Sequence, residues 1–252
     1  MIRSLLVALA AVLLLPAMAQ AQTVDEIIAK NAQARGGLEK LKSVKTMRMT
    51  ATVSAGSFRA QFVRDNKRDD KVREETILQG LARVRAYDGK TAWQVNPFRG
   101  RKDPELISQD NAKSLIVHAD IEGPLIDYKV KGHNAELLGH DSVEGTDCYK
   151  IKLTLKDRDV RYYYLDADSF LEIKIESESK IRGALQYTDT FLGDYDLVNG
   201  IYFPFAIETG ETGSEKREKF TVDKIVLNLL LDDAMFAMPV LKTDANPSPA
   251  VK

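Results

Sequence analysis

The chain has 252 residues, of which 44% are apolar and 29% charged, and 36 lysines and arginines are balanced by 37 aspartates and glutamates. This balance argues against nucleic acid as a partner, because phosphate binding usually requires a basic excess. The apolar share is enough to bury a core and argues against disorder. One cysteine and three histidines exclude a disulfide framework and a zinc site built on several thiolates. We therefore expect a soluble fold with no cofactor.

The first residues have the pattern of an export signal. Arg3 precedes an apolar run from Leu5 to Leu15, and the small residues Ala19 and Ala21 follow. A basic start, an apolar stretch of about 7–15 residues and a small-x-small site are the three parts of a secretory signal. The run is shorter than the ~20 residues that span a bilayer, so a membrane anchor is the weaker interpretation. We expect cleavage after Ala21 and no stable membrane insertion.

The mature chain is predicted to begin with a helix. Thr23 and Glu26 have the spacing of a capping box, and Ile27-Ile28 starts its apolar face. Gly36-Gly37 has the form of a C-terminal cap. A short second helical segment is expected over residues 38–44.

Beyond Lys45 the apolar period changes from about 3.6 residues to about 2, which is typical of half-buried strands. The stretch 64–71 is almost entirely charged, and we interpret it as a solvated hairpin end. The predicted strands of this half cover residues 47–53, 58–62, 72–78, 82–87 and 91–95.

A helix is predicted in the middle of the chain. Asp103-Pro104-Glu105 combines a capping residue, proline at the first helical position and an acidic first turn. Apolar residues follow at loosely helical spacing as far as Ala119, and Gly123-Pro124 ends the segment. We expect this helix to be inserted between two groups of strands.

The second half returns to alternating patterns. Asn199-Gly200 is a strong hairpin signal between two of the runs. The predicted strands cover residues 149–155, 160–165, 170–175, 185–191, 194–198, 201–207 and 219–229. The spacing predicts a mainly β (α+β) protein with one large curved antiparallel sheet, or barrel, of about 11 strands. A curved sheet of this kind encloses space in which apolar ligands bind.

Apolar and aromatic side chains of these elements are the candidates for the wall of such a cavity. Burying each ligand methylene yields about 0.8 kcal/mol, so a carrier of acyl chains needs no reacting group. Alternatively, the same side chains fill an ordinary hydrophobic core. The candidates are Met49, Phe58, Phe62, Trp93, Leu106, Leu115, Ile151, Tyr162, Tyr164, Leu171 and Phe191.

No motif for catalysis or metal binding is evident. His118, His133 and His140 lack metal-ligand spacing, and surface or capping roles are expected for them. Asp166 resembles the start of a calcium loop whose other ligands are missing, so a turn is favoured. Cys148 is interpreted as a small strand residue instead of a reactive thiol. An enzyme is the least favoured class; two buried carboxylates, or a histidine facing an acid, would revive it.

Several segments, in this order, resemble the outer-membrane lipoprotein-sorting protein family, the LolA/LolB-like carriers of the bacterial envelope. The resemblance spans residues 24–239 and is to divergent members. The segments that carry it are Ala34–Leu41, Tyr87–Pro97, Gly123–Tyr128, Lys131–His133, Tyr164–Asp166, Asn199–Pro204 and Phe236–Pro239.

The resemblance implies an unclosed barrel lidded by helices, with an apolar cavity for acyl chains. It implies a single LolA/LolB-like domain (22–242) after the expected signal peptide (1–21). Residues 243–252 contain two prolines and no aromatic residue, and we expect them to form a disordered tail. The function implied is that of a monomeric periplasmic carrier, or chaperone, for a lipid or the acyl chains of a lipoprotein. An envelope sensor or scaffold that binds a protein partner is the alternative.

The resemblance also implies an arginine on a strand that holds the lid. The strand segments of the first half offer Arg48, Arg59, Arg64 and Arg73. The sequence matches none of them individually to that role.

Overall fold

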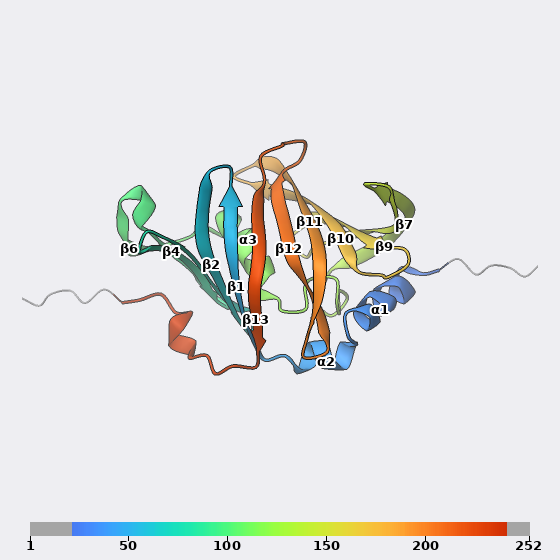
Figure 1. The fold of residues 1–252 in the computed structure, drawn as a ribbon, viewed down its shortest axis with the longest axis horizontal. Helices are drawn as coiled ribbons and strands as arrows, with labels where there is room; N and C mark the ends of the chain where they lie inside the picture. The colour runs from blue at the N-terminus through green and yellow to red at the C-terminus, as the bar shows by residue number, and fades with distance from the viewer. Residues whose placement is uncertain (1–21, 241–252) are drawn as a thin grey trace, which may run out of the picture.

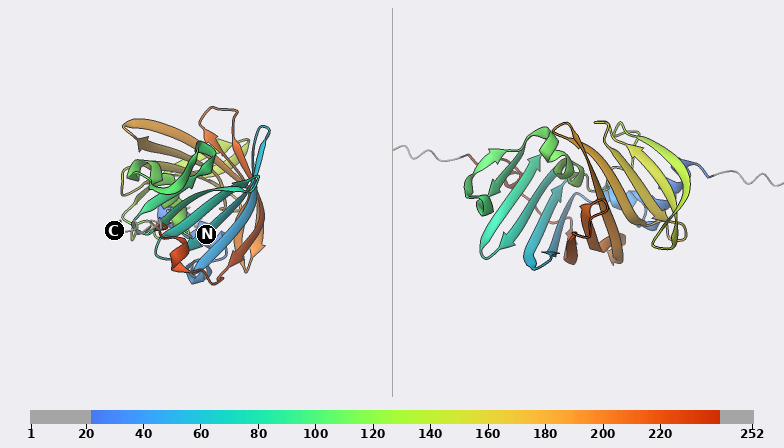
Figure 2. Two further views of the ribbon diagram at one scale, coloured as in Figure 1. Left: turned by 90° about the vertical axis from the view of Figure 1, so that its left-hand side faces the viewer. Right: turned by 90° about the horizontal axis from the view of Figure 1, so that it is seen from above.

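The computed structural model describes residues 22–240. Their strands form one antiparallel sheet of thirteen, in the order β6-β5-β4-β3-β2-β1-β13-β12-β11-β10-β9-β8-β7. The end strands β6 and β7 do not pair with each other, so the barrel is unclosed and the sheet curves strongly (Figures 1 and 2). The predicted fold class is confirmed, with thirteen strands in place of about eleven. The expected signal and C-terminal tail lie outside the described residues.

Two of the three α-helices precede the first strand, and the third lies between β6 and β7. The helices are α1 (Val24–Ala34), α2 (Leu38–Ser43) and α3 (Gln109–Ala119), with the 3-10 turns η1 (Pro97–Arg99) and η2 (Asp233–Met235). The strands are β1 (Thr46–Ala55), β2 (Phe58–Lys67), β3 (Lys71–Leu78), β4 (Leu81–Asp88), β5 (Ala92–Asn96), β6 (Arg101–Leu106), β7 (Asn134–Val143), β8 (Thr146–Thr154), β9 (Val160–Asp166), β10 (Glu172–Ile181), β11 (Ala184–Val198), β12 (Ile201–Glu211) and β13 (Glu218–Leu227).

The predicted N-terminal helix is confirmed, including its capping box. The Thr23 hydroxyl accepts from the Glu26 amide at 3.2 Å, and the Glu26 carboxylate accepts from the Thr23 amide at 2.8 Å. Gly36 follows the helix with φ +122°, and a Cβ there would overlap the carbonyl oxygen of Gly200. The turn after α1 therefore packs directly against the β11–β12 hairpin.

The charged stretch after residue 63 is largely strand, so its interpretation as a solvated hairpin end is wrong for residues 64–67. Asp65 is 2% exposed and accepts two hydrogen bonds from the Arg48 guanidinium, at 2.7 and 2.9 Å. Arg64 pairs with Glu74 of β3. Cross-strand ion pairs let charged residues occupy these positions. The turn itself begins only after Lys67.

The predicted start of the central helix is also wrong. Residues 103–106 belong to β6, where Glu105 pairs with Gln94 and accepts a hydrogen bond from its side-chain amide at 2.9 Å. Pro104 is tolerated because β6 is an edge strand, which leaves one row of backbone groups unpaired. The helix begins at Gln109 and ends at Ala119.

The second half contains a strand that the sequence pattern did not reveal. β7 is mostly polar and exposed, and its register shifts between Leu137 and Gly139. The predicted segments 185–191 and 194–198 form one strand, β11, with a positive φ at Asp194 between them. The hairpin at Asn199-Gly200 is confirmed.

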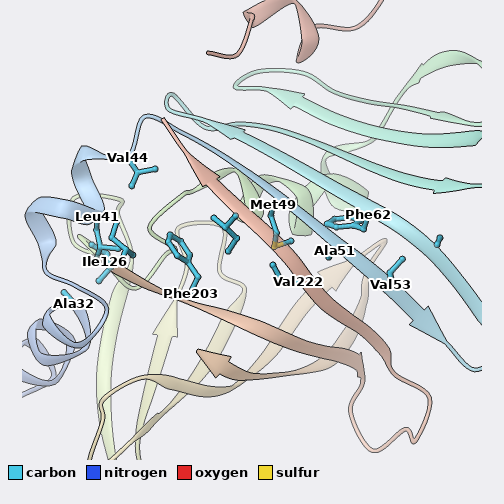
Figure 3. Packing of buried hydrophobic residues seen from close by; sticks show 13 residues of the cluster. Ala32, Leu41, Val44, Met49, Ala51, Val53, Phe62, Ile126, Phe203 and Val222 are labelled. Atoms are coloured by element: carbon cyan, nitrogen blue, oxygen red, sulfur yellow. The ribbon is translucent and has the colours of Figure 1, made fainter. Parts of the chain in front are cut away.

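Helices cover the concave side of the sheet (Figures 1 and 2). A first cluster of buried side chains lies at the centre of that side, and Figure 3 shows Met49, Phe62, Phe203 and Val222 within it. A second cluster joins α1 to β8 and β9, and a third joins α3 to β3 and β5. Two smaller clusters lie on the convex side, around Trp93 and around Tyr164.

Candidate functional site

The concave face of the central strands is an apolar floor. On β1, Met49, Ala51 and Val53 alternate with polar residues and are each at most 5% exposed. Their cross-strand partners on β2 and β13 include Phe62 and Val222, which are buried as well. Pairs directly opposite each other project to the same face, so the floor is continuous across these strands.

The floor continues into side chains that are only half-buried. Phe220 of β13 pairs with Val53 of β1 and with Ile207 of β12, which places all three on the concave face. Phe205, two residues before Ile207, shares that face. Phe205, Ile207 and Phe220 are neither buried nor fully exposed, and they form what we call the open floor.

Helix α3 covers one wing of the concave face. Ala112, Leu115 and Ala119 are at most 1% exposed and pack with Val72 of β3 and Ala92 of β5. Two of the three helix residues are alanines, so the helix approaches the sheet closely while burying little apolar area of its own.

Helix α1 and the segment after α3 cover the other wing. Ile27 and Ile28 pack with Ile151 and Leu153 of β8, together with Leu125. The open floor lies on the strands between the two covered wings.

A buried ionic cluster joins α3 to the strands. Arg64 of β2 donates to the Glu74 carboxylate of β3 at 3.0 Å. The Nδ1 atom of His118, near the end of α3, lies 2.9 Å from the same carboxylate and 3.1 Å from Arg64. Asn66 donates to the His118 carbonyl at 2.6 Å, and Arg85 lies 3.7 Å from Glu74.

The surroundings shift the pKa values of Glu74 and His118 in the cluster. Burial by itself raises the pKa of Glu74, but Arg64 and His118 together hold it well below its usual range. Burial and the charge of Arg64 lower the pKa of His118. We therefore expect an ionised Glu74 and a neutral His118 at pH 7. The His118 side chain is 41% exposed, so solvent reaches this side of the cluster.

The other end of α3 is attached to the opposite wing. Lys113 pairs with Asp159 at 2.7 Å, and Asp110 accepts from the Arg182 amide at 3.0 Å. Asp159 precedes β9, and Arg182 follows β10. The helix thus bridges the concavity and is attached on both sides by polar contacts.

Two hollows lie elsewhere on the surface. An open groove of about 300 Å³ runs between α1 and residues 126–130, with Ile28, Ala32, Leu38 and Val130 in its lining. A wider depression of about 1280 Å³ lies at the ends of the β1–β2 and β12–β13 hairpins and is lined by many charged residues. None of the residues that line the wider depression has a large apolar side chain, which the binding of an acyl chain needs.

A family model whose description reads "Uncharacterized protein" matches residues 112–243, more than half of the chain. The chain belongs to this family. No curated protein matches the chain at a significant level.

Solved structures identify the fold. A LolA superfamily protein from Nitrosomonas europaea has a TM-score of 0.58 at 16% identity, over 86% of this chain and 98% of that one. A DUF1329 family protein from Desulfovibrio piger has a TM-score of 0.59 at 13% identity, over 86% and 98%. A putative outer membrane lipoprotein-sorting protein domain from Vibrio parahaemolyticus has a TM-score of 0.58 at 14% identity, over 85% and 95%. The resemblance seen in the sequence is therefore confirmed as a shared LolA-like fold.

Within this LolA-like fold, the predicted cavity residues do not all lie together. Those on the concave side are Met49, Phe62, Leu115 and Ile151, all at most 5% exposed. Those on the convex side are Trp93, Tyr162, Tyr164 and Phe191. Phe58 and Leu106 are 40% and 67% exposed at strand ends, and Leu171 is half-buried before β10. A role in ligand binding stays a prediction for these residues.

The convex aromatic residues have structural partners of their own. The Trp93 indole donates to the Phe236 carbonyl at 2.7 Å, which attaches the C-terminal segment to the convex face. Lys150 and Arg217 lie over the rings of Tyr164 and Phe191, at 4.8 and 4.2 Å from the ring centres. Cys148 is fully buried in the same region, as expected of a small strand residue.

Of the four strand arginines named above, Arg64 contacts α3, since its guanidinium lies 3.1 Å from His118. Arg48 pairs with Asp65, and Arg73 pairs with Glu75. Arg85, which sequence reasoning did not consider, also reaches α3 through the Asn111 carbonyl at 3.4 Å.

His118 facing Glu74 is also the arrangement that an enzyme would use to activate a nucleophile. Among residues 22–240, the hydrogen-bond partners of His118 are Arg64, Asn66 and Glu74. No hydroxyl or thiol is among them, so an attacking group of this kind is not in place. The same residues hold no cluster of three or more histidine, cysteine or acidic side chains suited to a metal ion.

Within the part of the chain that the structure describes, none of the helices has the length and apolarity to cross a membrane.

Proposed function

We propose that the chain is an exported envelope carrier that binds a lipid, or the acyl chains of a lipoprotein, on its concave face. The observation that carries this proposal is the open floor of the concave face. Phe205, Ile207 and Phe220 extend a buried apolar surface and are themselves only partly buried. The LolA-like fold and the signal-like N-terminus agree with such a role.

The energetics favour a binding role. An acyl chain that buries about eight methylenes on the floor gains roughly 6 kcal/mol before the costs of association. Because the floor residues are half-exposed without ligand, binding displaces water from them and leaves the buried cluster intact.

The test is the lipid content of the protein purified without detergent, measured by solvent extraction and mass spectrometry. Phe220→Gln places an amide on the floor, and Thr221→Gln is its matched control because Thr221 is exposed on the convex face. We expect bound lipid in the native protein and in T221Q, and at least a tenfold loss in F220Q. Absence of bound or transferable lipid, or equal lipid in both variants, contradicts the proposal.

A second candidate is a sensor or scaffold that grips a protein partner. The groove beside α1 favours it, because Leu38 and Val130 are 41% and 86% exposed there. Exposed apolar groups in a groove are typical of docking sites. Val130→Asp is expected to abolish co-purification of a specific envelope protein and to leave the lipid content unchanged. A partner retained by V130D contradicts this candidate.

A further inference from the structure

Two arginines on the concave face have no anionic partner. Arg83 of β4 lies opposite Thr76, and Arg161 of β9 lies opposite Ser177. The Nε atoms of both are buried and make no hydrogen bond. Within residues 22–240 no carboxylate forms an ion pair with either guanidinium, and Arg161 donates only to the Ser177 hydroxyl, at 3.0 Å. Buried donors without a partner reduce stability, and each therefore calls for an explanation.

Helix α3 contacts the strands of both arginines. Arg85, two residues beyond Arg83 on the same face of β4, donates to the Asn111 carbonyl at 3.4 Å. Asp159, two residues before Arg161, pairs with Lys113 at 2.7 Å. Arg83 and Arg161 therefore lie in the two wings of the sheet that α3 joins.

The concavity has an excess of positive charge at this point. Arg64 and Arg85 share the single carboxylate of Glu74, and among residues 22–240 neither Arg83 nor Arg161 forms an ion pair with a carboxylate. Burial, Arg85 and Arg99 lower the pKa of Arg83, while Glu74 and Glu218 offset part of that effect. Two unpaired guanidinium groups in a partly desolvated concavity attract an oxyanion, which they bind through forked hydrogen bonds.

The apolar floor belongs to the same concave face as these arginines. In the strand order, β13 and β12 stand between β4 and β9, and they carry Phe205, Ile207 and Phe220. One ligand can therefore place an acyl chain on the floor and a charged group beside α3. We propose that the ligand is an anionic amphiphile whose carboxylate or phosphate headgroup binds Arg83 and Arg161. This inference rests on the carrier function proposed above and names its ligand class.

The test compares ligands that share an acyl chain and differ in charge. Equilibrium dialysis of the full-length protein, below the micelle concentrations, measures the binding of oleate, 1-oleoylglycerol 3-phosphate and the neutral 1-oleoylglycerol. Inorganic phosphate is measured separately. The variants are Arg83→Gln and Arg161→Gln, and the control is Arg59→Gln, because Arg59 is an exposed arginine at a convex-face position of β2. Circular dichroism and thermal unfolding verify that each variant is folded.

We expect the native protein and R59Q to bind the two anionic ligands at least tenfold more tightly than 1-oleoylglycerol. In R83Q and R161Q that preference is expected to fall by roughly 10- to 100-fold, while 1-oleoylglycerol binds as before. Equal binding of charged and neutral ligands by the native protein, or a preference retained in both variants, overturns the inference and leaves the carrier function standing. Inorganic phosphate bound as tightly as the phosphorylated lipid also overturns it. If none of the three oleoyl ligands binds, the carrier function fails as well.

Discussion

Replacing Glu74 by glutamine is expected to loosen α3 and destabilise the whole fold. Glu74 and Arg64 have side chains that are 9% and 18% exposed, so the variant leaves Arg64 and Arg85 in the concavity without a counter-ion. Removing one partner of a buried ion pair costs about 3–5 kcal/mol. The solvent that reaches His118, 41% exposed, places our expectation near the lower limit, at about 3 kcal/mol.

The pH dependence of stability tests the same cluster. The folded pKa of Glu74 lies below its unfolded value, so its contribution is present above about pH 4.3 and is lost as the pH falls further. Burial and Arg64 lower the folded pKa of His118, so the unfolded state takes up that proton first. Stability therefore declines as the pH drops through about 6.5. E74Q is expected to lose the acidic step near pH 4 that the native protein shows.

The assay is urea unfolding at pH 7 and across the acidic range, combined with hydrogen exchange of the α3 peptides. Glu105→Gln is the control, because its pair with Arg101 is exposed, at 32% and 67%, and is worth at most about 1 kcal/mol. E74Q is expected to lose more stability than E105Q and to show faster exchange in α3. Equal losses in both variants, or unchanged exchange in α3, would refute the reasoning.

Three further predictions concern packing. Gly36→Ala combines strain at φ +122° with overlap of a neighbouring carbonyl, whereas its control Gly139→Ala has φ +102° and open space around the new Cβ. Strain alone costs about 1–3 kcal/mol, so urea unfolding should show a larger loss of stability for G36A than for G139A. Equal losses would contradict the packing described for Gly36. Trp93→Phe removes the buried bond to the Phe236 carbonyl and should cost about 1–3 kcal/mol, with faster proteolysis of the C-terminal segment; unchanged proteolysis would argue against this attachment. Cys148 is fully buried, and burial raises its thiol pKa, so a thiol reagent at pH 8 should label it only in denaturant; rapid labelling of the folded protein would contradict this.

Local patterns in the sequence predict most of the strands. In these strands, apolar residues that face a buried cluster alternate with residues on the other face of the sheet, and this period of two is visible in the sequence. The alternation over residues 47–53 and 201–207 reports this directly. β7 shows no such alternation, since its side chains are mostly polar and exposed and its partner is β8 alone. Pro104 belongs to a strand that only its pairing with β5 reveals. Edge strands are held by backbone pairing more than by their own apolar pattern.

The candidate site depends on information that alternation does not contain. Trp93 and Phe62 have the same kind of pattern, but Trp93 faces outward and is covered by residues far along the chain, near Phe236. Which face becomes concave is decided by where the helices pack, and that is a tertiary property. His118 ends a predicted helix, yet its partner Glu74 lies in a distant strand, so the contact has no local signal.

The charge balance of the chain acquires a different meaning once the residues are placed. The near-equality of 36 basic and 37 acidic residues argues against a strongly basic surface as a whole. A balanced total still allows one region of the folded protein to hold more cations than anions. On the concave face, Glu74 is shared by two arginines, and the buried Nε atoms of Arg83 and Arg161 have no hydrogen-bond partner. Buried donors without a partner, and apolar side chains that are only partly buried, each reduce the stability of a fold. Both features become favourable together when one molecule supplies a chain to the floor and an anion to the arginines.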